Sequence, residues 1–337
     1  MIANLGFETY PLHIMEAKKS AVLIVAYRRS ENTKRIIDLC IKNGVPRLYV
    51  VVDFPADNRP ETTFDVNQTK EKIINASKSS SVPILYQFRE SNAGCAASVL
   101  SGCDWFFDNE SFGIVLEDDC IPSDSFFNMV GHYKEQLESN GDIWMICGTQ
   151  FAPELSSRDE ATLSKYALIW GWATSSKKWK EIAQSLRQSE NKARFVNLLS
   201  PESIYWNAGS RRSLNGFVDV WDTAVVNEMH QRRKFAILPK KSLVENIGSD
   251  EVATHTRSGS PWLNRDTGSF DGNGANAKYS SQIDQWLKEN FYKISIRHIL
   301  STRITFILDI YRRLRLRPNS LFERWDKALR ELKNLQS

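Results

Sequence analysis

The 337-residue sequence has few cysteines and no long apolar stretch. Its five cysteines, at positions 40, 95, 103, 120 and 147, are an odd number without a C-x-x-C pair. This argues against a disulfide scaffold and a zinc ribbon, and it fits a reducing compartment. No stretch approaches 18 apolar residues, so no membrane-spanning helix is expected. The N-terminus lacks a basic region followed by an apolar one, so no signal peptide is expected, and we predict a cytoplasmic protein.

The net charge of +4 is unevenly distributed. Residues 281–337 hold 12 of the 44 Lys and Arg but 6 of the 40 Asp and Glu, a net charge of +6 that leaves −2 for the rest. Within this tail, Lys293 to Arg317 has apolar residues at three- and four-residue steps, which predicts a basic amphipathic helix. Such a helix suits an anionic membrane surface at the inner face of the cell membrane. It could equally dock its apolar stripe on the domain.

In the first half of the chain, continuous apolar segments typical of buried strands alternate with segments that have the sequence pattern of helices. Continuous apolar stretches at 21–27, 47–53, 82–88 and 112–117 predict buried strands, and residues 33–40, 69–77 and 96–107 predict helices between them. In the second half we expect strands at 143–147, 166–170 and 235–238, and helices at 177–186 and 221–229. Strand–helix repetition with short links predicts an α/β fold, a mostly parallel sheet with helices on both faces.

Ligands of such sheets bind at the carboxyl ends of the strands. The residues expected at that edge form a rim of mixed charge: Tyr27-Arg28-Arg29, Asp53, Arg89-Glu90 and Glu117-Asp118-Asp119. This composition suits a charged ligand that binds together with a metal ion.

The most informative segment is Gly113 to Pro122, in which an apolar strand leads directly into Glu117-Asp118-Asp119. Adjacent carboxylates repel one another, so a cation beside them is favourable. Oxygen ligands that leave positions open suit Mg²⁺ or Mn²⁺ shared with a diphosphate. A solvated acidic turn at a strand end is the alternative that the triplet alone leaves open.

The triplet and its surroundings resemble the GT-A-fold glycosyltransferases, in particular the N-acetylglucosaminyltransferase I type and bacterial surface-polysaccharide glycosyltransferases. The matching pieces occur in order over about residues 20–257: Asn92-x-Gly94-Cys95, Gly102-x-Asp104-Trp105-Phe106-Phe107, Leu116-Glu117-Asp118-Asp119-Cys120-x-Pro122, Ile169-Trp170-Gly171-Trp172-Ala173-Thr174, Trp221-Asp222, and Asn246-Ile247-Gly248 with Ala253-Thr254-His255-Thr256. The chain departs from the family at 220–225 and 174–176, so the acceptor is not carried over.

The resemblance implies a GT-A (Rossmann-like) domain over 15–257, with a donor half at about 15–122 and an acceptor half at about 123–257. After this domain, composition rather than the resemblance predicts a mobile Ser/Gly-rich loop at 258–280 and the basic amphipathic tail at 281–337, which the resemblance does not cover. The resemblance further implies a metal-dependent, inverting, hexosyltransferase-like enzyme of cell-surface polysaccharide synthesis. The donor would be a nucleotide-diphosphate sugar, with a UDP-sugar favoured, and the acceptor a glycan or lipid-linked hydroxyl. Mn²⁺ or Mg²⁺ would be the cofactor, and no nucleic acid partner is expected.

The resemblance also assigns roles to particular residues. Asp119, with Asp118 near it, would hold the metal. Asp222 would be the general base, with Asp219 as the competing candidate, although an aspartate at a helix start can also simply complement the helix dipole. Donor-binding candidates are Arg28, Arg35, Asp53, Asp118, Trp221 and His255. Arg28, Arg35 and Asp53 could equally be ordinary surface charges, and a lone histidine such as His255 is more often a surface residue than a ligand.

Trp170 and Trp172, which flank a glycine, are candidates for the sugar or acceptor pocket because flat indole faces pack against pyranose rings. A buried aromatic pair at a tight bend is the alternative.

Two other functions compete with this interpretation. A sugar-nucleotide nucleotidylyltransferase would share the architecture, but it needs a glycine-rich phosphate loop after the first strand, where this chain has Tyr27-Arg28-Arg29-Ser30. A non-catalytic peripheral membrane-binding protein would depend on the tail alone. Basic residues interleaved with Ile and Leu favour lipid over nucleic acid there.

Overall fold

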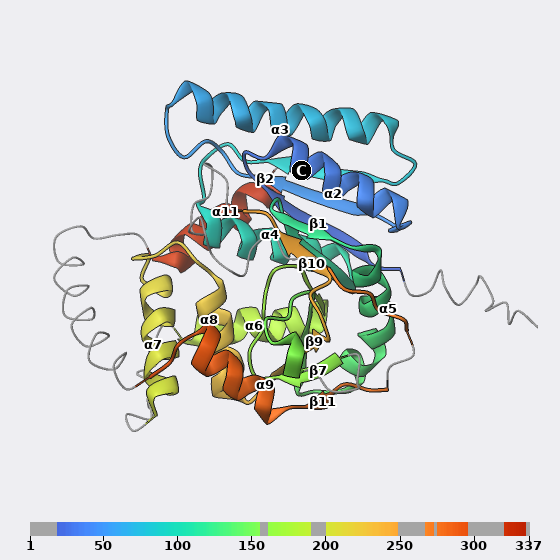
Figure 1. The fold of residues 1–337 in the computed structure, drawn as a ribbon. Coiled ribbons are helices and arrows are strands. Elements are labelled where there is room, and N and C mark those ends of the chain that lie inside the picture. Colours follow the sequence, from blue (N-terminus) through green and yellow to red (C-terminus); the bar gives the residue numbers. More distant parts are fainter. Residues whose placement is uncertain are drawn as a thin grey trace, which may run out of the picture.

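A computed structural model describes residues 19–155, 161–189, 200–248, 267–272, 275–295 and 320–334. These residues form a nine-stranded sheet with helices on both faces, and a separate pair of short strands (Figure 1). From one edge to the other, the large sheet contains β11 (Lys278–Tyr279), β7 (Ala161–Ser164), β9 (Phe235–Pro239), β6 (Ile143–Cys147), β8 (Trp172–Ser175), β4 (Phe112–Glu117), β1 (Ala21–Ala26), β2 (Leu48–Val52) and β3 (Ile84–Phe88). The pair consists of β5 (Cys120–Pro122) and β10 (Val244–Asn246).

Most neighbouring strands of the large sheet run parallel. β1 pairs in parallel with β2 and β4, β2 with β3, β6 with β9, and β11 with β7. β8 is antiparallel to both β4 and β6, so it joins the two halves of the sheet, and β7 is antiparallel to β9. The predicted α/β fold with a mostly parallel sheet flanked by helices is confirmed.

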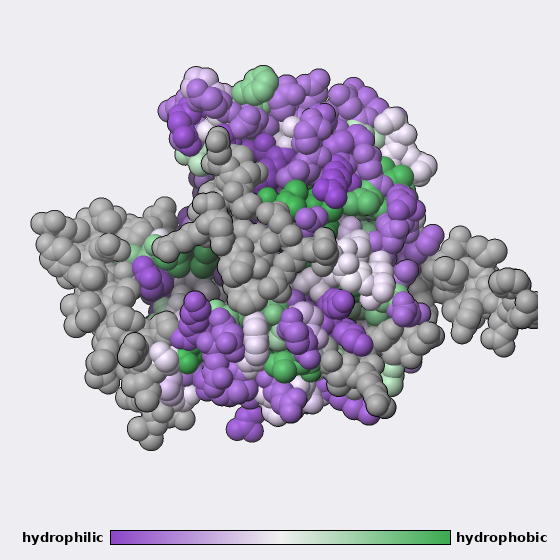
Figure 2. Space-filling model, in the orientation of Figure 1, coloured by the Kyte–Doolittle hydropathy of each residue, from purple (hydrophilic) through white to green (hydrophobic). Residues whose placement is uncertain are grey.

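Helices bury each face of this sheet. One face packs against α2 (Ser30–Lys42), α3 (Pro60–Ser79) and α5 (Asp124–Ser139). The other packs against α4 (Cys95–Asn109), α6 (Ser176–Ser189) and α11 (Leu321–Asn334). The remaining helical elements are η1 (Pro153–Leu155), α7 (Pro201–Leu214), α8 (Asp222–Arg232), α9 (Ser281–Trp286) and η2 (Leu287–Phe291). Strands such as β1 are buried on both faces, which explains their continuous apolar sequence. Over α2 and α3 the visible surface is mostly hydrophilic (Figure 2).

The expected strand at 166–170 is wrong. Strands lie on either side of this segment, as β7 and β8, and the segment itself has no strand structure. Its apolar residues Tyr166, Ala167 and Leu168 are buried without belonging to a strand of the sheet. Gly171 has φ +71°, a left-handed conformation that breaks the extended backbone just before β8. Burial and strand structure are therefore separate properties here.

The C-terminal helix α11 packs on α4. Leu321, Trp325 and Leu332 are fully buried, and the Trp325 indole donates a hydrogen bond of 2.9 Å to Asp104 of α4. Part of the predicted tail is thus packed on the domain. Residues 296–319, which hold most of the predicted amphipathic helix, lie outside the described residues, as do 258–266 and 273–274 of the predicted 258–280 loop. The described part of that loop includes β11. None of the helices in the described ranges has the length and apolar content that a bilayer-spanning segment requires.

Candidate active site

The site is built around the turn that follows β4. Because β4 runs parallel to β1, the carboxyl ends of both strands meet at one edge of the sheet. Asp118, which is 5% exposed, accepts hydrogen bonds of 2.8 Å from the Tyr27 backbone N–H and from Arg29 Nη1. Its own N–H donates to the Val25 carbonyl at 3.1 Å. Asp118 therefore fixes the segment after β1 against the acidic turn.

Asp119 is more accessible than Asp118. Its carboxylate Oδ2 lies 3.6 Å from Arg29 Nη1, and its side chain is 18% exposed. The Cys120 thiol donates to Oδ1 at 3.3 Å, and the Ile247 N–H donates to the Asp119 carbonyl at 2.9 Å. Burial, followed by the charge of Asp118, raises the pKa of Asp119. A nearby cation would stabilise the ionised form of a carboxylate in this position.

Glu117 connects the triplet to the start of α8. The Trp221 side chain donates a hydrogen bond to Glu117. Burial raises the pKa of Glu117 well above its ordinary value, and the charges of Asp119, Asp118 and Asp222 add to this rise. Asp222 therefore lies within electrostatic reach of the triplet, although about 100 positions separate them in the sequence.

Asp222 occupies the first turn of α8, where its Oδ1 accepts a hydrogen bond of 2.7 Å from the Thr223 N–H. Its charge also reaches two tyrosines, Tyr205 of α7 and Tyr292 after η2, whose pKa values are raised mainly by burial and further by Asp222. The sequence analysis missed both tyrosines. No local pattern marks them, because α7 and η2 approach α8 only through the tertiary fold.

Asp219, the competing candidate for the base, has different contacts. Its Oδ2 accepts the Cys95 N–H at 2.7 Å and its Oδ1 the Ala96 N–H at 3.2 Å, both at the N-terminus of α4. Arg324 of α11 donates to Oδ1 at 2.8 Å. These contacts use both carboxylate oxygens of Asp219 to hold the start of α4 and the guanidinium of Arg324.

The two arginines after β1 point to different partners. Arg28, predicted to bind the donor, pairs with Asp65 of α3 at 2.6 Å. Its neighbour Arg29 pairs with the acidic turn, and the sequence analysis did not choose it although it lies on the same rim. Arg35 is exposed on α2.

Asp53, another donor-binding candidate, is buried at the carboxyl end of β2. It accepts N–H groups from Phe54 at 2.9 Å and from Ala93 and Gly94 at 3.0 Å each. Asp53 thus braces the neighbouring loop between β3 and α4.

The two candidate tryptophans of the sugar pocket differ in exposure. Trp172 is 1% exposed, and its ring lies 5.5 Å from that of Trp221 and 6.0 Å from that of Trp179, so it is a core residue. Trp221 is 3% exposed. Trp170 is half-buried and packs edge-on against Phe151, with ring centroids 5.1 Å apart. His255 lies outside the described residues.

The acidic turn can be tested for its fit to a metal ion. Among the described residues, no group of three His, Cys, Asp or Glu side chains is placed to hold a metal by itself. Asp119, with Asp118 beside it, supplies the carboxylate oxygens that Mg²⁺ and Mn²⁺ prefer. Asp118 is already engaged with Tyr27 and Arg29, so Asp119 is the principal ligand candidate. The donor set fits a cation that completes its coordination with diphosphate and water.

Replacing Gly248 by Ala is expected to weaken cation-dependent nucleotide binding. A Cβ at Gly248 would lie 2.3 Å from Asp119 Oδ2, so the carboxylate would have to move. A displaced carboxylate would coordinate the cation less well, so the affinity for UDP with Mn²⁺ is expected to fall. Titration of UDP in the presence of Mn²⁺ measures the effect. Gly141→Ala is the matched control because a Cβ there meets nothing within 4 Å. Equal affinity in both variants would contradict the placement of Asp119.

No protein-family model matches the chain, and no curated protein matches it. Many solved structures are similar to parts of it, including the following three. HddC from Yersinia pseudotuberculosis, complexed with GMP-PN, is 14% identical over 47% of this chain and 77% of that chain, with a TM-score of 0.30. Glucosyl-3-phosphoglycerate synthase from Mycobacterium tuberculosis, in complex with Mn²⁺, UDP and glucosyl-3-phosphoglycerate, is 12% identical over 52% of this chain and 64% of that chain, with a TM-score of 0.31. UDP-glucose pyrophosphorylase complexed with UDP-glucose is 9% identical over 67% of this chain and 92% of that chain, with a TM-score of 0.38. At values this low, function has to be argued from the site itself.

Proposed function

We propose that the chain is a metal-dependent, inverting glycosyltransferase of the GT-A type. It would move a sugar from a nucleotide-diphosphate sugar, preferably a UDP-sugar, to a hydroxyl of a glycan or lipid-linked acceptor in cell-surface polysaccharide synthesis. One observation carries the proposal: the carboxylate triplet at the end of β4 and Asp222 at the start of α8 belong to one electrostatic cluster. A metal-binding group and a base on opposite sides of a bound sugar are what a single displacement requires.

Each residue in this cluster has a proposed task. Asp119, supported by Asp118, would hold Mn²⁺ or Mg²⁺, which supplies charge neutralisation to the departing nucleoside diphosphate. Arg29, already beside both aspartates, adds a permanent positive charge to the same place. Asp222 would accept the proton of the acceptor hydroxyl as it attacks the anomeric carbon. The half-buried Trp170 would offer its ring to the sugar or acceptor.

The contacts of Tyr27 count against the nucleotidylyltransferase alternative. Such an enzyme would use open backbone N–H groups after the first strand to hold a nucleoside triphosphate. Here the Tyr27 N–H is occupied by Asp118 at 2.8 Å. Release of pyrophosphate from a nucleoside triphosphate and a sugar 1-phosphate would favour that alternative. Release of a nucleoside diphosphate from a nucleotide-sugar would support the glycosyltransferase.

A thermal-shift panel tests the proposed function. Nucleoside diphosphates and nucleotide-sugars, each with Mn²⁺, with Mg²⁺ and with EDTA, are compared with nucleoside monophosphates and free sugars. A ligand present at 100 times its Kd raises the free energy of unfolding by about 2.7 kcal/mol, so a binder is expected to raise Tm visibly. We expect at least one diphosphate to do so only with the cation. The absence of any shift across the panel would contradict the proposal.

A further inference from the structure

The loop between β3 and α4 (residues 89–94) and the first turn of α4 are held by carboxylates through their backbone N–H groups. Glu331 accepts hydrogen bonds from the N–H groups of Glu90 and, at 3.0 Å, Ser91. Asp53 then accepts those of Ala93 and Gly94, and Asp219 those of Cys95 and Ala96. Three carboxylates thus accept hydrogen bonds from six backbone N–H groups of one continuous segment, residues 90–96, and so fix the position of its backbone.

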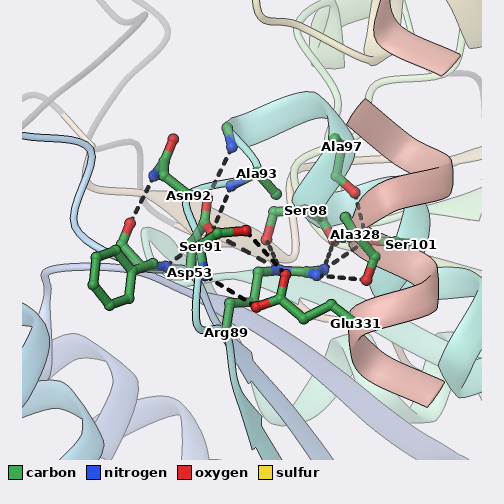
Figure 3. A network of polar contacts seen from close by, with 12 residues as sticks. Asp53, Arg89, Ser91, Asn92, Ala93, Ala97, Ser98, Ser101, Ala328 and Glu331 are labelled. Atoms are coloured by element: carbon green, nitrogen blue, oxygen red, sulfur yellow. Dashed lines mark hydrogen bonds and ion pairs between the residues drawn. The ribbon is translucent and has the colours of Figure 1, made fainter. Parts of the chain in front are cut away.

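Each of these three carboxylates is connected to the C-terminal helix α11. Glu331 is part of α11, and Asp219 pairs with Arg324 of α11 at 2.8 Å. Asp53 faces Arg89, with 3.9 Å between carboxylate oxygen and guanidinium nitrogen. Arg89 is 1% exposed, and its Nη1 donates to the Ala328 carbonyl of α11 at 3.0 Å. Figure 3 shows Arg89 and Glu331 between this loop and α11.

The segment held in this way ends beside the candidate active site. The pKa of the Cys95 thiol is raised mainly by burial and further, in decreasing order, by the charges of Glu117, Asp219, Asp222 and Asp119. The approach is tight as well, because a Cβ at Gly94 would lie 2.5 Å from Asp219 Oδ2 and 2.6 Å from Arg324 Nη1. A shift of α11 would therefore move the start of α4 against the acidic cluster.

We infer that Arg324 and Glu331 of the C-terminal helix are positioning residues for the donor site, an inference that rests on the proposed function. They act through the backbone of residues 90–96 and touch no substrate themselves. Leu321, Trp325 and Leu332 are fully buried, so apolar packing contributes to the docking of α11 independently of these two polar side chains. Their task is to fix the position of the loop, because misplacements of about 1 Å lower reaction rates in active sites by up to about 10²-fold.

The test compares Arg324→Ala and Glu331→Ala with Arg330→Ala, which removes an exposed cation from the same helix. Hydrogen exchange of the peptide that covers residues 89–96 is measured first, because it needs no ligand. UDP affinity with Mn²⁺ is measured next, at a temperature at which every variant is folded. We expect faster exchange in this peptide and about 10-fold or greater weakening of UDP binding in both test variants. Arg324→Lys, which keeps the charge beside Asp219, should restore much of the loss.

The outcomes separate this inference from the proposed function. If the wild-type protein binds no nucleotide, the proposed function fails. Faster exchange at 89–96 in the test variants would then still support the inference that Arg324 and Glu331 position this segment, and unchanged exchange would overturn it. If the wild type binds UDP but both test variants behave like Arg330→Ala, the positioning inference is overturned and the proposed function stands. Loss of the cooperative thermal transition in Arg324→Lys as well as in Arg324→Ala would make α11 a structural helix and also overturn the inference.

Discussion

Replacement of Asp222 by Asn is expected to lower kcat by about 10²–10⁴-fold, the usual contribution of a general base, while UDP affinity changes little. Asparagine keeps the size of the side chain and an oxygen that can accept the Thr223 N–H, but it cannot take a proton. The helix start should therefore remain intact, and the loss should appear in the chemical step. Single-turnover transfer and calorimetric UDP binding, measured side by side, check this split between catalysis and binding.

Asp219→Asn is the matched comparison for this experiment. Asp219 holds the Cys95 and Ala96 N–H groups and Arg324, so its neutral variant should disturb the position of α4 and reduce donor affinity. A near-normal turnover of Asp222→Asn combined with an inactive but UDP-binding Asp219→Asn would move the base to Asp219. If both variants turned over normally, a single displacement with a carboxylate base would be wrong.

Replacement of Asp119 by Ala is expected to remove the dependence of UDP binding on a divalent cation. The cation is proposed to contribute about 3 kcal/mol or more through the diphosphate, which corresponds to a loss of about 10²-fold. Asp38→Ala is a suitable control because Asp38 is an exposed carboxylate whose ion-pair partner in the described part of the chain is Lys34, one turn away on α2. A control that lost affinity equally would show that general negative charge, rather than Asp119, attracts the cation.

Local sequence patterns were sufficient for the central elements of the fold. β1, β2 and β4 are continuous apolar stretches because both of their faces are covered by helices. The acidic turn could be placed at the edge of the sheet because parallel strands bring their carboxyl ends together. At 166–170 the same reasoning failed, because an apolar segment can be buried without pairing and Gly171 turns the chain.

Contacts between distant residues could not be predicted from the sequence. Arg28 and Arg29 are neighbours of the same type, and only the fold directs one to Asp65 and the other to the acidic turn. Asp219 and Arg324 are 105 positions apart, and Ser91 and Glu331 are 240 apart. The sequence marked the C-terminal region as a basic tail because charge can be counted locally, whereas the role of α11 depends on backbone N–H groups that it meets only after folding.

The central claim is that the carboxylate turn after β4 binds a nucleoside diphosphate through a divalent cation. Calorimetric titration of UDP, and of the other nucleoside diphosphates in parallel, into the wild-type and Asp119→Ala proteins, with Mn²⁺ and with EDTA, tests it most directly. We expect binding of at least one diphosphate to the wild-type protein with Mn²⁺, at least about 10²-fold weaker binding with EDTA, and equally weak binding to Asp119→Ala in both conditions. Affinity that is the same with Mn²⁺ and with EDTA, or an Asp119→Ala protein that binds as tightly as the wild type, would contradict it.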